Sequence, residues 1–84
     1  MADATKKPII LIVDDTPENL DVLGGILRRN YKVKAALNGE KALRIANAEP
    51  RPDMILLDVM MPVMDGHEVC RRLKADPATK GIPI

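Results

Sequence analysis

Three aspartates follow two apolar runs of this sequence. Asp14 and Asp15 come directly after the run Ile9–Val13, and Asp58 comes directly after the run Met54–Leu57. If the two runs form neighbouring strands, the three carboxylates converge, and their mutual repulsion opposes folding unless a cation joins them. Carboxylate oxygens in an open site suit Mg²⁺. A carboxylate beside Mg²⁺ can also act as a nucleophile toward a phosphoryl group.

Each of these acids also has an ordinary structural explanation. Asp14 and Asp15 stand before a Thr-Pro pair that is typical of a helix start, where an acid or a hydroxyl caps backbone N–H groups. Asp58 can start a turn. The shared position of the three acids, each at the end of a buried run, is more specific than any one of them and favours a common site.

The elements that must position these acids alternate between strand and helix. The two apolar runs are continuous, which indicates strands buried on both faces of a parallel sheet. Between them, lysines alternate with apolar residues, which indicates an edge strand with one wet side. The expected strands are residues 9–13, 31–37 and 54–57, the expected helices are residues 17–29, 40–48 and 66–75, and residues 81–84 read as the start of a further strand.

This alternation predicts an α/β fold with a parallel sheet and right-handed crossovers. The lysine-bearing strand should lie at the edge and the two apolar runs should be central, which gives the spatial order two-one-three. In open sheets of this class, ligands bind at the carboxyl ends of the strands where the strand order reverses. The acids follow the two strands that flank that point.

Composition limits the remaining possibilities. The chain of 84 residues is long enough for one small domain, and with 46% apolar but 1% aromatic residues its core must be aliphatic. A net charge of +1 excludes a strong basic field for nucleic acid, and no apolar run approaches the length of a membrane helix. The chain has one histidine, His67, which we expect at the surface, and one cysteine, Cys70, which we expect to be a buried thiol. One cysteine without a visible secretory signal fits a cytoplasmic protein.

Two motifs resemble a known family. Residues 12–15 read Ile-Val-Asp-Asp, and residues 57–66 read Leu-Asp-Val-Met-Met-Pro-Val-Met-Asp-Gly. Together they resemble the receiver domain of bacterial two-component response regulators, and the likeness runs over residues 8–84, with residues 1–7 as a flexible leader. The resemblance implies a five-stranded flavodoxin-like fold in the order 2-1-3-4-5. We expect residues 8–84 to form its N-terminal two thirds, truncated as the fourth strand begins.

The resemblance also implies the roles of individual residues. Asp58 would accept a phosphoryl group from a histidine kinase or a phosphotransfer protein, as part of two-component signal transduction or a phosphorelay. Asp15 and Asp58 would bind Mg²⁺ through their carboxylates, Asp14 would assist through water, and Met60 would contribute its backbone carbonyl. The family also uses a Ser or Thr after the fourth strand and a Lys after the fifth. Thr79 precedes the expected fourth strand and is no substitute, so we expect impaired phosphorylation.

Two other functions compete with this interpretation. The first is a structural module that has lost switching and self-associates through the exposed edge of Met54–Leu57, with residues 81–84 exchanged or paired between copies. The second is a Mg²⁺-dependent phosphatase of the haloacid dehalogenase type, which needs a second Asp two residues after its nucleophile. Position 60 is Met, so we expect no enzyme of this kind. Direct binding to nucleic acid or membrane is not expected.

Overall fold

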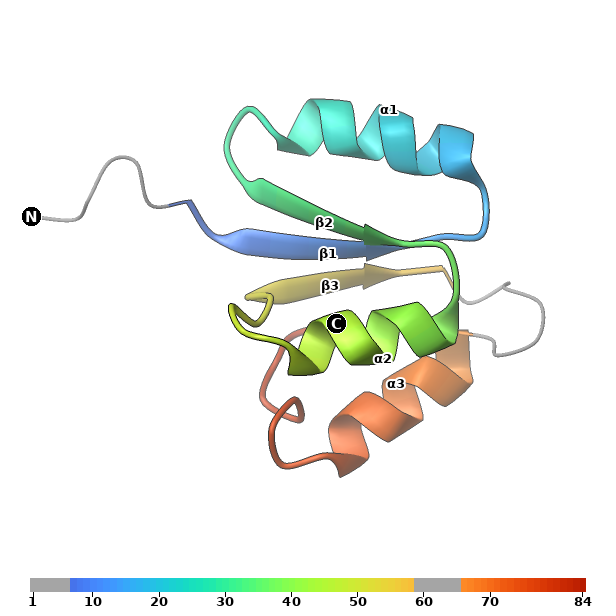
Figure 1. Ribbon diagram of the computed structural model, residues 1–84, viewed down its shortest axis with the longest axis vertical. Helices are drawn as coiled ribbons and strands as arrows, with labels where there is room; N and C mark the ends of the chain where they lie inside the picture. Colours follow the sequence, from blue (N-terminus) through green and yellow to red (C-terminus); the bar gives the residue numbers. More distant parts are fainter. Residues whose placement is uncertain (1–6, 59–65) are drawn as a thin grey trace, which may run out of the picture.

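The strand β1 (Ile9–Val13) lies at the centre of a three-stranded parallel sheet. It pairs with β2 (Lys32–Ala36) on one side and with β3 (Met54–Leu57) on the other, as Figure 1 shows for the computed structural model. The structure describes residues 7–58 and 66–84. Its sheet order β2-β1-β3 confirms the predicted order and the α/β class, and the three strands form part of a flavodoxin-like fold.

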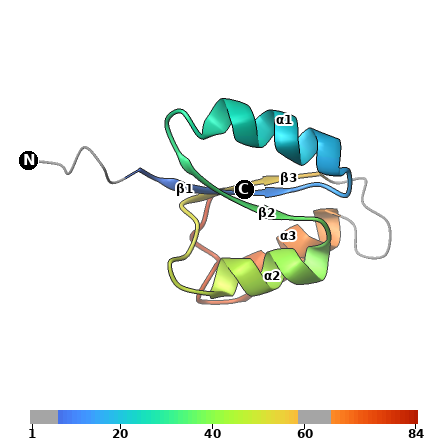
Figure 2. The same cartoon turned by 45° about the horizontal axis from the view of Figure 1, so that its top comes forward.

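Within the described residues, three helices cover the two faces of the sheet. Helix α1 (Pro17–Leu27) lies on one face, whereas α2 (Gly39–Asn47) and α3 (Gly66–Ala75) lie side by side on the other (Figures 1 and 2). Successive strand residues point to opposite faces, so β1 contributes to two separate cores. One holds Ile10, Ile12 and Leu20 beneath α1. The other lies beneath α2 and α3 and contains the aliphatic residues Leu11, Val13, Ala36, Ala42, Ala46, Ile55, Val69 and Leu73.

The faces of the two outer strands, β2 and β3, are not buried in the way the sequence predicted. We expected one exposed face for β2 and two buried faces for β3. In β2, Val33 packs toward α1 while Ala36 is buried beneath α2, so both faces of the strand are partly covered. In β3, Ile55 is fully buried, but Met54 is 42% and Leu56 37% exposed. The prediction of a strand buried on both faces is therefore wrong for β3. Helix α1 packs on β1 and β2, which leaves the α1 side of β3 open.

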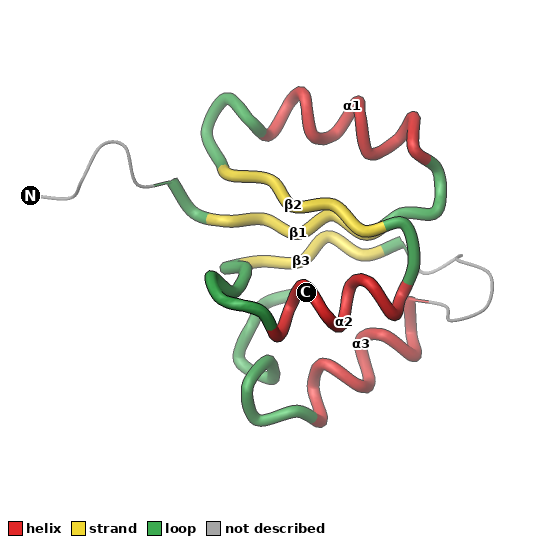
Figure 3. Tube along the Cα trace, in the orientation of Figure 1, coloured by secondary structure: helices red, strands yellow, loops and turns green. Residues whose placement is uncertain are grey.

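Figure 3 shows where the helices begin and end along the chain. Local hydrogen bonds explain two of these boundaries. Helix α1 ends at Leu27 rather than at residue 29, because the N–H groups of Asn30 and Tyr31 both donate to the Leu27 carbonyl and close the last turn. At the start of α2 the Asn38 side chain accepts a hydrogen bond of 2.8 Å from the Lys41 N–H, as an N-cap should. The range predicted for α3 is confirmed.

The segment after α3 turns back against the sheet. The hydroxyl of Thr79 is fully buried and donates to the Leu73 carbonyl at 2.7 Å. Lys74 donates to the carbonyls of Lys80 and Ile82, and the Ile55 N–H donates to the Pro83 carbonyl at 2.9 Å. The strand predicted over residues 81–84 is not formed in the described part of the chain. Proline lacks the N–H that a continuing ladder requires.

Two further expectations concern the ends of the described ranges. The predicted leader over residues 1–7 lies outside the described residues except for Lys7, whose ammonium donates to the Arg28 carbonyl at 3.4 Å. None of the helices within residues 7–58 and 66–84 combines the length and the apolar character needed to cross a bilayer.

Candidate functional site

The ends of β1 and β3 carry the aspartates, and the sheet itself holds their backbones. The Asp14 N–H donates to the Ala36 carbonyl at 3.1 Å, and the Asp58 N–H donates to the Val13 carbonyl at 2.9 Å. Each acid therefore lies one residue beyond its strand but still within the hydrogen-bond ladder. Because Val13 pairs with Leu57, the register brings Asp14 beside Asp58.

Strand alternation then directs the side chains of Asp14 and Asp58 to the same face. Ile12 packs beneath α1, and Leu56 lines the same cleft as Ile12. Asp14 and Asp58 each follow one of these residues by two positions, so their side chains point to the α1 face as well. Asp15 is the next residue along the chain and is exposed.

The three carboxylates converge as their sequence positions predicted. One oxygen from each of Asp14, Asp15 and Asp58 lies within 4.8 Å of the others, with Asp14 and Asp58 half-buried and Asp15 exposed. Negative charges this close repel each other, and a cation among them removes the repulsion. The donor set consists of oxygen atoms on an open cleft, which fits Mg²⁺ better than a softer metal.

Asp14 also performs the local structural work that was its alternative explanation. Its Oδ1 accepts a hydrogen bond of 2.9 Å from the Thr16 N–H, and its Oδ2 accepts one of 3.2 Å from Asn19 Nδ2. Thr16 is the N-cap residue of α1, yet its side chain makes no capping hydrogen bond. The Thr16 hydroxyl instead donates a hydrogen bond of 3.4 Å to Asp15 Oδ1. Asp14 therefore closes the turn that leads into α1 rather than capping an N–H of its first turn, and the Thr16 side chain provides no cap.

Asn19 is the residue that our sequence interpretation missed. It lies in the first turn of α1, four residues after Asp15, and it lines the same cleft as Asp14 and Asp58. The signal that could have revealed it is this spacing, which places one side chain of a following helix over the end of the preceding strand.

A cleft of about 360 Å³ runs from the acids along the surface between α1 and β3. Its polar end is formed by Asp14, Asn19 and Asp58, whereas Leu23 and Leu56 form its apolar walls. Both leucines are 37% exposed. Solvent therefore reaches Asp14 and Asp58 through an open cleft that is charged at the end near these acids and apolar along its walls.

Other residues singled out in the sequence do not join this cluster in the described part of the chain. The Met60 carbonyl, predicted as a metal ligand, lies outside the described residues. His67 is exposed, as predicted. Cys70 is partly buried rather than fully enclosed. Thr79 is held by α3, which agrees with its exclusion as a site residue.

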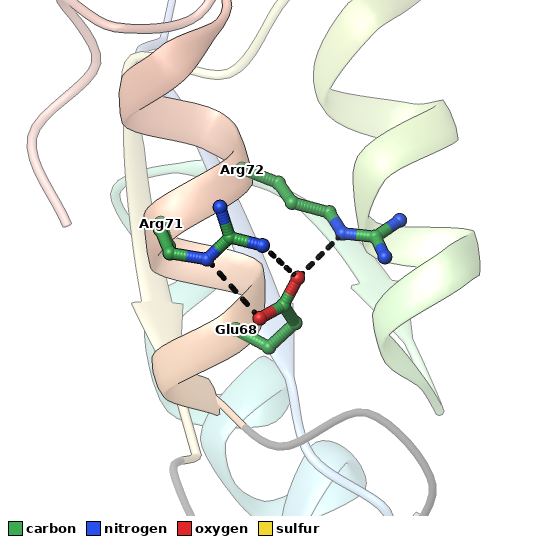
Figure 4. A network of polar contacts seen from close by, with 3 residues as sticks. All are labelled: Glu68, Arg71 and Arg72. Carbon is green, nitrogen blue, oxygen red and sulfur yellow. Dashed lines mark hydrogen bonds and ion pairs between the residues drawn. The ribbon is translucent and has the colours of Figure 1, made fainter.

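A second group of charges lies on α3 (Figure 4). Glu68 accepts hydrogen bonds from Arg71 at 2.5 Å and 3.2 Å and from Arg72 at 2.8 Å. The hydrogen bonds from Arg71, and then from Arg72, lower the pKa of Glu68 to about 2. The same contact raises the pKa of Arg71. These exposed side chains, one helical turn apart, form the solvated helix face expected for the arginine pair.

This chain is similar to known proteins both in sequence and in fold. Residues 10–84 match the family described as the response regulator receiver domain. The response regulator PleD of Caulobacter vibrioides is 51% identical over 76 residues, which cover 89% of this chain and 16% of that protein. The N-terminal domain of a response regulator receiver protein from Methanoculleus marisnigri is 49% identical with a TM-score of 0.85, covering 89% of this chain and 61% of that one.

A third relative is the receiver domain of the sensor histidine kinase PA1611 from Pseudomonas aeruginosa. It is 35% identical with a TM-score of 0.86, and the match covers 94% of this chain and 65% of that one. In that structure a magnesium ion is coordinated in the active site cleft. The present chain thus spans less than two thirds of the length of these relatives.

Proposed function

This chain belongs to the response regulator receiver domain family, and from that premise we propose that Asp58 is a phosphoacceptor for a histidine kinase or a phosphotransfer protein. The observation that carries the proposal is the convergence of three carboxylate oxygens within 4.8 Å at the carboxyl ends of β1 and β3. A receiver domain generally implies a histidine kinase as partner, and receiver domains are generally not classical enzymes.

The proposed step is an in-line transfer of a phosphoryl group. A carboxylate oxygen of Asp58 attacks the phosphorus atom of a phosphohistidine on the partner protein. The new P–O bond makes an acyl phosphate while the P–N bond breaks, and the imidazole leaves with that electron pair and takes a proton from water. The hydrogen bond from the Asp58 N–H to the Val13 carbonyl supports this role, because it fixes the backbone of the nucleophile at the end of the sheet.

We propose that Asp15 and Asp58 hold Mg²⁺ directly, that Asp14 assists through water, and that the Met60 backbone carbonyl completes the protein ligands. When bound, Mg²⁺ supplies positive charge to the phosphoryl oxygens and to the acids. Support comes from the three converging carboxylates and from the magnesium ion in the Pseudomonas aeruginosa receiver domain. The Met60 part of the proposal rests on the family resemblance alone.

Incubation with Mg²⁺ and a small phosphodonor, followed by intact mass measurement, tests the proposal. We expect the mass of one phosphoryl group to be gained by the wild type and to be lost in Asp58→Asn. The matched control is Asp21→Asn, which removes an exposed acid on the outer side of α1 and should retain the gain. A wild type that binds Mg²⁺ but gains no mass would contradict the phosphoacceptor role.

A second candidate function is a self-associating module without switching. It rests on the open side of β3, where Met54 is 42% and Leu56 37% exposed. We propose that two copies pair along this flank and bury these side chains, with the segment around Pro83 exchanged between copies. The Ile55–Pro83 hydrogen bond supports an exchangeable contact, because the same bond can form between two chains.

Light scattering over a range of protein concentrations tests this second candidate. We expect Met54→Lys to remain monomeric while the wild type associates. Leu37→Lys is the matched control, because Leu37 is 41% exposed but lies after β2. A wild type that stays a folded monomer at all concentrations would remove self-association from consideration.

A further inference from the structure

The structure assigns Asn19 as a positioning residue of the acid site: its amide group holds Asp14 so that the Asp14 carboxylate faces Asp15 and Asp58. This inference rests on the proposed Mg²⁺ site and names a residue on α1 that completes it. Asn19 Nδ2 donates to Asp14 Oδ2 at 3.2 Å. Asn19 also lines the cleft together with Asp14 and Asp58.

Both oxygens of the Asp14 carboxylate are held by the start of α1. Oδ1 accepts from the Thr16 N–H at 2.9 Å, and Oδ2 accepts from Asn19. A carboxylate held by one hydrogen bond can still turn about the bond that carries it, whereas two donors define the plane of the group. Asp14 is thereby oriented before any cation binds.

The position of Asn19 is set by the core and not by the site. Leu20, the next residue of α1, is buried against Ile10 and Ile12 of β1. This contact fixes the height and rotation of the first turn of α1 over the sheet. Asn19 is then placed at the edge of the helix that faces the end of β1, where its amide reaches Asp14.

The orientation matters for a ligand that acts through water. A group bound to the cation only through a water molecule contributes affinity only when its oxygen already faces the hydrated ion. Without Asn19, the Asp14 carboxylate must give up rotational freedom when the cation binds. Removing the hydrogen-bond partners of metal ligands typically weakens metal binding by about 10-fold to 100-fold. Because Asn19 and its contact with Asp14 are exposed, we expect the lower end, about 10-fold.

Calorimetric titration with Mg²⁺ tests the assignment. We expect Asn19→Ala to raise the Mg²⁺ dissociation constant by about 10-fold. Asn47→Ala, the matched control, removes an exposed asparagine that donates to the Leu43 carbonyl on α2, and it should bind as the wild type does. A dissociation constant of Asn19→Ala within about twofold of the wild type would overturn the inference, since that is far below the expected loss.

A double-mutant cycle separates positioning from a general structural effect. If Asn19 acts through the Asp14 carboxylate, Asn19→Ala should have little effect in an Asp14→Asn background. An equal loss in both backgrounds would show that Asn19 acts in another way and would also overturn the inference. Where calorimetry is too insensitive for the double variant, water relaxation with Mn²⁺ provides the same comparison.

The result also distinguishes the two proposals. A wild type without measurable Mg²⁺ binding would remove the proposed metal site altogether. A wild type that binds Mg²⁺ while Asn19→Ala binds equally well would leave the metal site standing and remove only the role of Asn19.

Discussion

Replacing Asp58 by Asn should stabilise the protein when no divalent cation is present. The substitution keeps the size of the side chain and removes one of three charges that lie within 4.8 Å of one another. In the unfolded chain Asp58 lies far from Asp14 and Asp15 along the sequence, so its repulsion with them arises mainly on folding. The variant should therefore have a larger free energy of unfolding.

The separation of the charges gives the magnitude. At the upper limit of this separation, 4.8 Å, two unit charges repel by about 0.9 kcal/mol at the dielectric constant of water, which suits exposed and half-buried groups on an open cleft. Asp58 has two such partners, and screening at about 0.1 M salt, where the Debye length is about 10 Å, removes roughly a third to a half of the repulsion. The expected gain is about 1 kcal/mol.

Urea unfolding without Mg²⁺, in the presence of a chelator, measures this gain as a higher midpoint with an unchanged slope. Asp21→Asn removes the same charge from the exposed side of α1 and should leave the midpoint nearly unchanged. Saturating Mg²⁺ should reverse the ranking, because a ligand bound only by the folded state stabilises it and Asp58→Asn lacks one ligand. An Asn variant that is no more stable than the wild type in chelator would refute the reasoning.

Three further predictions concern α1, α3 and the segment after α3. Thr79→Val should lower the free energy of unfolding by about 1–3 kcal/mol, because it leaves the buried acceptor at Leu73 without its hydroxyl partner; chemical denaturation measures this, with Thr79→Ser retaining most of the stability. Gly25→Ala should raise thermal stability by up to about 1 kcal/mol, since a Cβ there meets nothing within 4 Å and alanine favours a helix; an unchanged or lower midpoint would contradict it. The Glu68 carboxyl should titrate near pH 2 by NMR, and since this pKa is lowered from 4.5, its contribution to stability is present above pH 4.5 and is lost as the pH falls toward 2. Replacement of Arg71 by Gln should move that titration back toward 4.5.

Much of the fold was predictable because the relevant signals are local. A continuous apolar run ended by an acid identified β1 and β3, and the Thr-Pro pair and the proline-rich stretch after residue 48 marked helix boundaries. Lysines at alternate positions identified β2 as an outer strand. Errors occurred where burial depends on what packs above a strand. The run in β3 looks like that in β1, but α1 packs mainly on β1 and β2.

The candidate site likewise has features that the sequence predicted and features that only the tertiary structure decided. The sequence by itself determined that three aspartates end two neighbouring parallel strands, because strand order follows from alternation and hydrophobicity, and the family resemblance assigned their expected roles. Only the tertiary structure decided how those carboxylates are held. Asn19 reaches Asp14 because Leu20 packs against β1, and Thr79 is buried because the chain after α3 folds back. Contacts of this kind depend on distances between elements, which no local pattern of residues encodes.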